Sequence, residues 1–71
     1  MITVQKSFGD RLKLMREVKC LSQEQLAQRV SSSRVYICEL ECGKANPSIQ
    51  ILSQIANGLG MTLSELLDGV T

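Results

Sequence analysis

The sequence predicts an all-α protein, a compact bundle of five helices. Apolar residues recur with helical spacing in every segment, and no segment alternates apolar and polar residues as a strand does. Hydroxyl-bearing residues and glycines stand where helices are expected to begin and end. The length of 71 residues suits one domain, near the lower limit for folding on a single core. We therefore expect one domain over residues 1–71, with its core within about residues 8–67.

The first helix is expected from about Val4 to Val18. Phe8, Leu12 and Met15 recur at the spacing of one helix face and form an apolar stripe. Cys20 stands where this helix should stop, a position that usually favours glycine. The exact end of this helix is therefore left open.

The second helix is expected to start at Ser22. Ser22 and Gln25 have the spacing of a capping box, in which each side chain bonds the other residue's backbone N–H. A turn of three serines follows, and its last residue, Ser33, is the expected N-cap of the next helix. The expected buried side of the second helix is Leu26, Ala27 and Val30.

The third helix is expected from about Arg34 to Glu41, before Gly43. At 100° per residue, Ile37 and Leu40 face the core, with Glu41 at the margin. Two short helices joined this closely leave one face of the second helix free to enter a DNA groove. The residues expected on that free side are Val35, Glu39 and Cys42, flanked by Arg34, Tyr36 and Cys38.

Two further helices complete the expected bundle. Pro47 and Ser48 open the fourth, which is expected to run from about Ser48 to Leu59 and to end at Gly60. Its expected inward residues are Ile49, Leu52, Ile55, Ala56 and Leu59. Thr62 and Glu65 repeat the capping-box pattern and start a fifth helix of one to two turns. The fifth helix would carry Leu63, Leu66 and Leu67.

Charge is distributed unevenly along the chain, although the net charge is only +1. All eight Lys and Arg fall in residues 1–44, where five acidic residues leave a net charge of +3, whereas residues 45–71 carry −2. A basic front part and an acidic back part fit a molecule with a DNA-facing side and a separate protein-facing side. Chance asymmetry in a short chain is the alternative.

Composition argues against several classes of function. Without histidine the chain lacks the usual general base and the commonest metal ligand, so we expect no hydrolase or metalloenzyme and no cofactor. No apolar run approaches the roughly 20 residues of a membrane helix, and no signal peptide is recognisable at the N-terminus. Three cysteines, an odd number, suit a reducing cytosol. We expect a cytoplasmic protein with no membrane partner.

Cys38 and Cys42 lie four residues apart on the expected third helix. Their β-carbons should be about 5–6 Å apart, beyond the roughly 3.5–4.5 Å of a disulfide. Three thiols without histidine also make a poor zinc site. We interpret the cysteines as ordinary small residues; the alternative is that their oxidation blocks DNA, because both lie close to the expected DNA face.

The chain resembles the Cro/CI-type helix-turn-helix family of phage and bacterial regulators over about residues 8–67. The pattern is carried in order by Arg16, Leu21-Ser22-Gln23-Glu24, Leu26-Ala27, Ser33-Arg34, Tyr36-Ile37, Glu39, Glu41, Gly43-Lys44, Asn46-Pro47-Ser48, and Ile55-Ala56 with Leu59-Gly60. Each piece is common, but the whole set at this spacing is specific. The resemblance implies a lambda-repressor-like bundle in which the second and third helices form the helix-turn-helix.

The chain departs from the family pattern at three positions. Ser31 stands where the family usually has glycine, so a left-handed backbone there would carry a steric cost. Ser32 replaces a small apolar residue. Cys42 stands where Asn or Arg often touches phosphate, which puts that contact in doubt.

The resemblance implies roles for the third helix in reading bases. An arginine at its start can pair with guanine O6 and N7, and a glutamate can accept from cytosine N4 or hold a nearby cation. A valine can pack on a thymine methyl group, and a tyrosine hydroxyl can reach a phosphate or base edge. An ordinary solvated helix face is the alternative. The expected base contacts are Arg34, Val35, Tyr36 and Glu39.

Other residues are expected to contact phosphate or to hold the fold. The start of the second helix offers free N–H groups that attract anions, although Ser22 can be simply a cap and Lys44 an ordinary surface lysine. In the resembling family a residue pair such as Arg16 and Glu41 tends to form a partly buried ion pair. The expected phosphate contacts are Ser22, Gln23, Ser33, Lys44 and Asn46.

Residues 45–64 contain no charged side chain. Surfaces depleted in charge and bordered by apolar residues suit protein contacts, so this part of the chain is a candidate homodimer interface. Dimerisation also lets two half-sites about 34 Å apart be read together. A solvated, amide-rich helix is the alternative. The expected interface residues are Ile51, Leu63, Leu67 and Val70.

These expectations converge on a non-enzymatic regulator that binds double-stranded DNA as a homodimer on a roughly palindromic operator. It would repress, or activate by contacting RNA polymerase. The resemblance suggests a phage-type repressor or a restriction–modification controller protein. Two alternatives remain at this point: an antitoxin that binds both DNA and a toxin, and an adaptor that has kept the fold without binding DNA.

Overall fold

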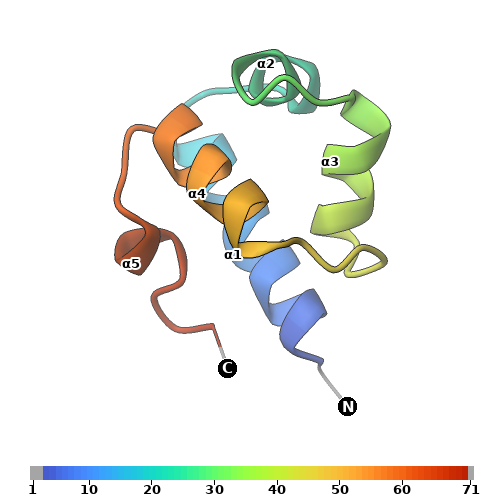
Figure 1. The fold of residues 1–71 in the computed structure, drawn as a ribbon, viewed down its shortest axis with the longest axis vertical. Helices are drawn as coiled ribbons and strands as arrows, with labels where there is room; N and C mark the ends of the chain where they lie inside the picture. Colours follow the sequence, from blue (N-terminus) through green and yellow to red (C-terminus); the bar gives the residue numbers. More distant parts are fainter. Residues whose placement is uncertain (1–2, 71) are drawn as a thin grey trace.

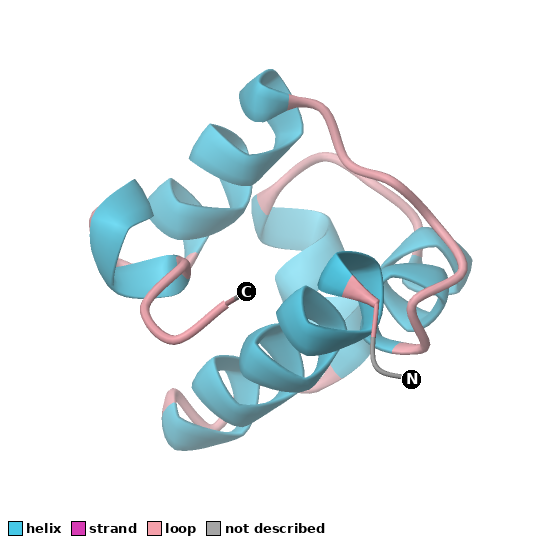
Figure 2. Ribbon diagram, turned by 90° about the horizontal axis from the view of Figure 1, so that it is seen from below, coloured by secondary structure: helices cyan, strands magenta, loops and turns pink. Residues whose placement is uncertain are grey.

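Five helices, each begun by a serine or threonine, make up the computed structural model, which describes residues 3–70. They are α1 (Val4–Val18), α2 (Gln23–Arg29), α3 (Arg34–Glu41), α4 (Ile49–Gly58) and α5 (Leu63–Leu66). No strand occurs among the described residues, and the predicted all-α bundle is confirmed (Figure 2). The helix bounds differ from the predicted ones by a residue or so, because Ser22 and Ser48 are caps and lie just outside their helices.

The side chain of every N-cap residue accepts a hydrogen bond from the backbone N–H three residues later. Ser22–Gln25 and Thr62–Glu65 are both complete capping boxes, as the sequence predicts. In the second box the Thr62 backbone N–H donates to Glu65 Oε1 at 2.9 Å. This hydrogen bond, with that of the Thr62 hydroxyl, lowers the pKa of the Glu65 carboxyl below its ordinary value. Each helix start is therefore fixed by its own local sequence.

The helices enclose one aliphatic core. Figure 1 shows α3 and α5 on opposite sides of the molecule, with α1 and α4 between them and α2 across one end. Arg11 ties α5 to α1, because its Nη2 donates to the Glu65 carbonyl at 2.7 Å. No helix among the described residues is both long and apolar enough to cross a membrane. The buried apolar residues are Phe8, Leu12, Leu26, Ala27, Val30, Ile37, Leu40, Ile55, Ala56, Leu59 and Leu66.

Ile49 corrects one expectation about the core. The helical pattern places it inward, but its side chain is 76% exposed, more than any other large apolar residue of the described chain. Ile49 is the first residue of α4, directly after the cap Ser48. The packed core ends near Leu52, which is itself only half-buried, so the first turn of α4 projects beyond it.

Within residues 3–70, two non-glycine residues adopt left-handed backbone conformations. Cys20, after α1, has φ +58° and Ser31, after α2, has φ +55°. Both occupy positions at which the sequence pattern favours glycine. In each turn the backbone N–H of the next residue donates to a carbonyl of the preceding helix; for Ser31 this is the bond from Ser32 to the Ala27 carbonyl, at 2.8 Å. A β-carbon in this conformation costs about 1–2 kcal/mol. Both turns are therefore held by the structure around them.

A buried ion pair joins α1 to α3. Arg16 Nε lies 2.6 Å from Glu41 Oε2, and Arg16 Nη2 lies 3.2 Å from Glu41 Oε1. Arg16 Nη1 also donates to the Leu21 carbonyl at 2.7 Å, and Gln23 Nε2 donates to Glu41 Oε1 at 3.1 Å. The hydrogen bonds that Arg16 donates to the Glu41 carboxylate raise the pKa of Arg16 above its ordinary value. The network connects α1, the start of α2 and the end of α3.

Gly9 allows α1 and α3 to approach closely beside this pair. A β-carbon at Gly9 would lie 2.5 Å from the Leu40 carbonyl oxygen and 2.6 Å from that of Glu41. These are backbone atoms at the end of α3, which cannot rotate away as a side chain can. The sequence pattern gave no indication of this contact, because a glycine inside a helix has no apolar or charged side chain to mark it.

We predict that Gly9→Ala destabilises the protein, although alanine is the better helix former by about 1 kcal/mol. The new methyl group would force α1 and α3 apart, and overpacking of this kind costs about 1–3 kcal/mol or more. A net loss of about 2 kcal/mol should lower the melting temperature by about 10 °C in a domain of this size. Thermal denaturation followed by circular dichroism measures the change.

Gly58→Ala is the matched control. A β-carbon there would meet the Val30 Cγ1 methyl at 2.9 Å, a side-chain atom rather than a fixed backbone atom. We expect a smaller loss than at Gly9. A Gly9→Ala protein as stable as the parent would show that α1 and α3 are not held in this close contact.

We also predict that Glu41→Ala costs about 3–5 kcal/mol of stability, because it leaves the buried Arg16 guanidinium without its carboxylate. Glu39→Ala is the control, since Glu39 lies on the same helix but is exposed. Its effect on unfolding free energy should stay within about 0.5 kcal/mol. Urea denaturation of both variants measures the difference, and equal losses would argue against a structural role for the pair.

Candidate nucleic-acid interface

The outer face of α3 is the most distinctive exposed surface of the bundle. Ile37, Leu40 and Glu41 are the buried residues of this eight-residue helix. Arg34, Val35 and Glu39 are exposed, with 60% of the Val35 side chain accessible. The buried residues are thus confined to one side, Val35 and Glu39 lie on the other, and Arg34 is exposed at the flank.

Tyr36 and Cys38 flank this face and are half-buried. Tyr36 packs against the core, so less of its ring is free for contact with a base than the sequence pattern suggests. Its backbone N–H donates to the Ser33 hydroxyl oxygen at 3.1 Å, which fixes the start of α3. Cys42 is exposed at the end of the helix.

The residues predicted to contact phosphate occupy four different settings. Ser22 and Ser33 are exposed N-caps whose hydroxyl oxygens accept from backbone N–H groups, which leaves their O–H groups able to donate. Gln23 is half-buried, and its amide is engaged with Glu41. Lys44 is exposed, and its backbone N–H donates to the Glu39 carbonyl at 2.9 Å, which holds the loop against α3.

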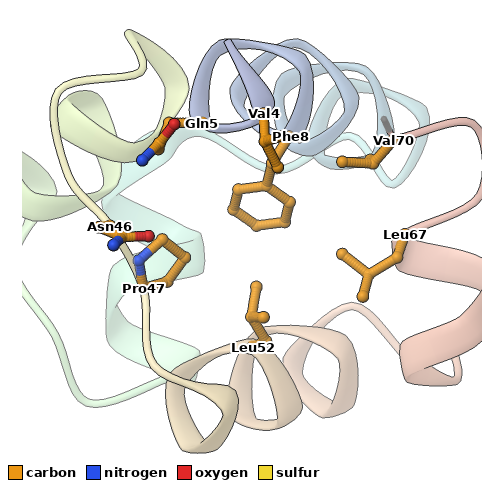
Figure 3. Close-up of a pocket in the computed structure, with 8 residues that line it drawn as sticks. All are labelled: Val4, Gln5, Phe8, Asn46, Pro47, Leu52, Leu67 and Val70. Atoms are coloured by element: carbon orange, nitrogen blue, oxygen red, sulfur yellow. The ribbon is translucent and has the colours of Figure 1, made fainter.

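Asn46 lies in the loop between α3 and α4. It lines an apolar groove of about 310 Å³ between the start of α1, the start of α4 and the C-terminal segment, beside Pro47 (Figure 3). Its side chain is exposed there.

Lys6 adds a basic residue that the sequence pattern did not indicate. It comes from the first turns of α1, but a β-carbon on Gly43 would lie 3.0 Å from Lys6 Cα, so the two segments touch. Lys6 Nζ lies 2.9 Å from Asp10 Oδ1, and the Asp10 carboxylate, with a smaller contribution from Cys42, raises the pKa of Lys6. Lys6 and Lys44 therefore place two positive charges around the end of α3. The position of Lys6 near the end of α3 follows only from the long-range contact between α1 and the turn at Gly43.

The residues predicted to form a dimer interface are half-buried and pack against the core. Leu67 and Val70 line the apolar groove together with Phe8 and Leu52, and the Phe8 ring forms its centre (Figure 3). Ile51 and Leu63 are not among the residues that line it. The groove lies between α1, α4 and α5, and α5 is on the side of the molecule opposite α3 (Figure 1).

Comparison with known proteins identifies the family. Residues 7–68 match the family model described as a helix-turn-helix domain. The chain is 44% identical over 64 residues to the control protein C.MunI of Mycoplasma sp, covering 89% of this chain and 86% of the relative. It is 36% identical over 61 residues to the immunity repressor protein of Bacillus phage phi105, covering 86% of this chain but 42% of the repressor.

Solved structures show the same architecture. The restriction–modification controller protein C.AhdI from Aeromonas hydrophila superposes with a TM-score of 0.86 at 35% identity, covering 87% of this chain and 90% of that one. With a matching family model over most of its length and close relatives in sequence and structure, the chain belongs to the helix-turn-helix domain family, among its Cro/CI-type transcriptional regulators.

Proposed function

We propose that this protein is a sequence-specific transcriptional regulator that binds a roughly palindromic operator in double-stranded DNA as a homodimer. The observation that carries the proposal is that α3 has a buried and an exposed side. Three buried residues anchor it in the bundle, while Arg34, Val35 and Glu39 remain exposed. The controller and repressor proteins among its relatives support the same function. Such a protein acts on DNA in the cytoplasm of a bacterium.

Base reading falls to the exposed face of α3. The Arg34 guanidinium can donate two hydrogen bonds to guanine O6 and N7, the commonest specific contact in the major groove. Val35 can pack on a thymine methyl group, and Glu39 can accept from cytosine N4 or orient Arg34. Tyr36, half-buried, contributes at the margin of this face.

Phosphate contacts supply salt-dependent affinity and set the position of α3 on the duplex. Three of these residues are exposed: Ser22 at the start of α2, Ser33 in the turn before α3, and Lys44 just after α3. Lys6 lies beside the turn that follows α3. Gln23 and Asn46 complete the set, with Gln23 also holding Glu41. Occupying promoter DNA represses transcription, and contact with RNA polymerase from the same position activates it. The relatives described above are named as regulators rather than as enzymes.

We predict that Arg34→Ala and Lys44→Ala weaken DNA binding in different ways. Arg34→Ala should lose about 1–3 kcal/mol on the preferred sequence and relax the preference at one base pair. Lys44→Ala should weaken binding to all sequences about equally and reduce the slope of log affinity against log salt by about 1. Selection from a randomised duplex pool, followed by titration at several salt concentrations, separates the two effects.

Lys19→Ala is the control, because Lys19 is exposed on the side of the molecule that carries α5. It should change neither the selected sequence nor the salt slope. If the parent protein enriches no sequence and its affinity hardly varies with salt, the proposed function is wrong and the adaptor alternative is favoured. A toxin that co-purifies with the chain would favour the antitoxin alternative.

The homodimer interface is proposed on the face formed by α4, α5 and the apolar groove. Residues 45–64 carry no charge, and Leu67 and Val70 line the groove. Ile51 and Leu63, half-buried, contribute apolar surface beside them. Ile49, exposed at the start of α4, extends this surface beyond the predicted set. Because α5 lies on the side of the molecule opposite α3, pairing through the α5 side of this face leaves both copies of α3 free (Figure 1).

We predict that Ile49→Glu weakens dimerisation at least about tenfold without unfolding the protein, because the side chain is exposed in the single chain. Leu14→Glu is the control: Leu14 is 51% exposed on α1 but lines neither the apolar groove nor the hollow beside α5. Sedimentation equilibrium measures both dissociation constants. Equal dimerisation of the two variants would place the interface elsewhere.

A further inference from the structure

Two of the three cysteines lie on α3, one helical turn apart. Cys38 is within the helix and Cys42 caps its end with helical backbone angles, φ −85° and ψ −5°. The Cys42 backbone N–H donates to the Cys38 carbonyl at 2.9 Å, so the helix is intact between them. Both are free thiols, Cys42 exposed and Cys38 half-buried. Residues four apart on a helix lie on the same face.

This spacing disfavours a disulfide but suits a shared ligand. β-carbons at this separation are about 5–6 Å apart, whereas a disulfide needs roughly 3.5–4.5 Å. An ion bound to both sulfurs inserts two bonds of about 2.3 Å between them and spans the pair without unwinding the helix. No cluster of three or more histidine, cysteine or acidic side chains is present in residues 3–70, so zinc would lack its usual four ligands.

We propose that Cys38 and Cys42 form a two-thiol site for a soft, thiophilic centre that two sulfur ligands satisfy, and that its occupation obstructs DNA binding. Such a centre is an organic trivalent arsenical, which keeps its carbon substituent as the third bond, or the mercuric ion. Soft sulfur ligands favour soft ions over magnesium or calcium. The proposed obstruction of DNA binding rests on the proposed function. The proposed two-thiol site depends only on the two cysteine side chains and the helix that carries them.

The position of the site explains the expected effect on DNA. Cys38 follows Arg34 by one helical turn, and Cys42 follows Glu39 by three residues, so the pair adjoins the proposed base-reading face. Lys6 lies beside Gly43, the residue after Cys42, since a β-carbon on Gly43 would lie 3.0 Å from Lys6 Cα. An ion with its remaining substituent would therefore stand where a phosphate would approach the end of α3.

Phenylarsine oxide tests the site directly on the full chain. The reagent condenses with two thiols, forming two arsenic–sulfur bonds and releasing one water, with no change in oxidation state. We expect one adduct per chain by intact mass spectrometry and a fall in titratable thiols from three to one. Unchanged helical circular dichroism would show that the helix stays folded around the adduct.

Cys20→Ser is the matched control, because Cys20 is an exposed free thiol in the turn after α1. This variant should bind the reagent as tightly as the parent. Cys38→Ser and Cys42→Ser should each bind at least about 100-fold more weakly, since a single thiol loses the effective concentration of the second. Equal binding by either variant would overturn the proposal, and so would tight binding of Zn²⁺ by the parent.

The DNA measurement uses the duplex selected from the randomised pool. Formation of the adduct should weaken binding at least about tenfold, and excess 1,2-ethanedithiol should restore it by removing the arsenic. The mercuric ion should act in the same way. An adduct that leaves DNA affinity unchanged would overturn the proposed obstruction. If the unmodified chain binds no duplex, the proposed function is wrong. The number of titratable thiols still decides whether Cys38 and Cys42 form the two-thiol site.

Discussion

The buried pair between Arg16 and Glu41 is the constraint on which the arrangement of the helices depends. Removing two charges from water is expensive, and an apolar pair of similar size would often be no less stable. What the ion pair supplies is direction: two hydrogen bonds fix the rotation of α3 against α1, and bonds to Leu21 and Gln23 bring in the start of α2. No buried side-chain polar atom among residues 3–70 lacks a hydrogen-bond partner.

That rotation determines which side of α3 meets solvent. With Glu41 held inward and Gly9 allowing the two backbones to touch, a turn of α3 about its axis would break the pair or create a clash. Arg34, Val35 and Glu39 consequently face solvent because of contacts made by other residues, the Arg16–Glu41 pair and Gly9. Positioning a reading surface on a rigid element, with the support beneath it, is what accurate recognition requires.

Much of this could be predicted from sequence because the relevant signals are local. Hydroxyl caps, apolar periodicity and the turn positions that favour glycine located all five helices. The buried side of α3 could be predicted by placing its residues at 100° intervals around the helix axis. Three features depend on contacts between distant segments and could not be predicted. These are the close approach at Gly9, the placement of Lys6 beside Gly43, and the exposure of Ile49, where the core ends before the helix does.

The caps have a consequence for the speed of folding. Helix nucleation is the costly step, because several residues must be ordered for the first hydrogen bond. Here a side chain at each of five starts, from Thr3 to Thr62, accepts one of the backbone N–H groups that the first turn leaves unpaired. Helical bundles with mainly local contacts fold in microseconds to milliseconds. A newly made chain of this kind is therefore expected to reach its folded state within about milliseconds of its release.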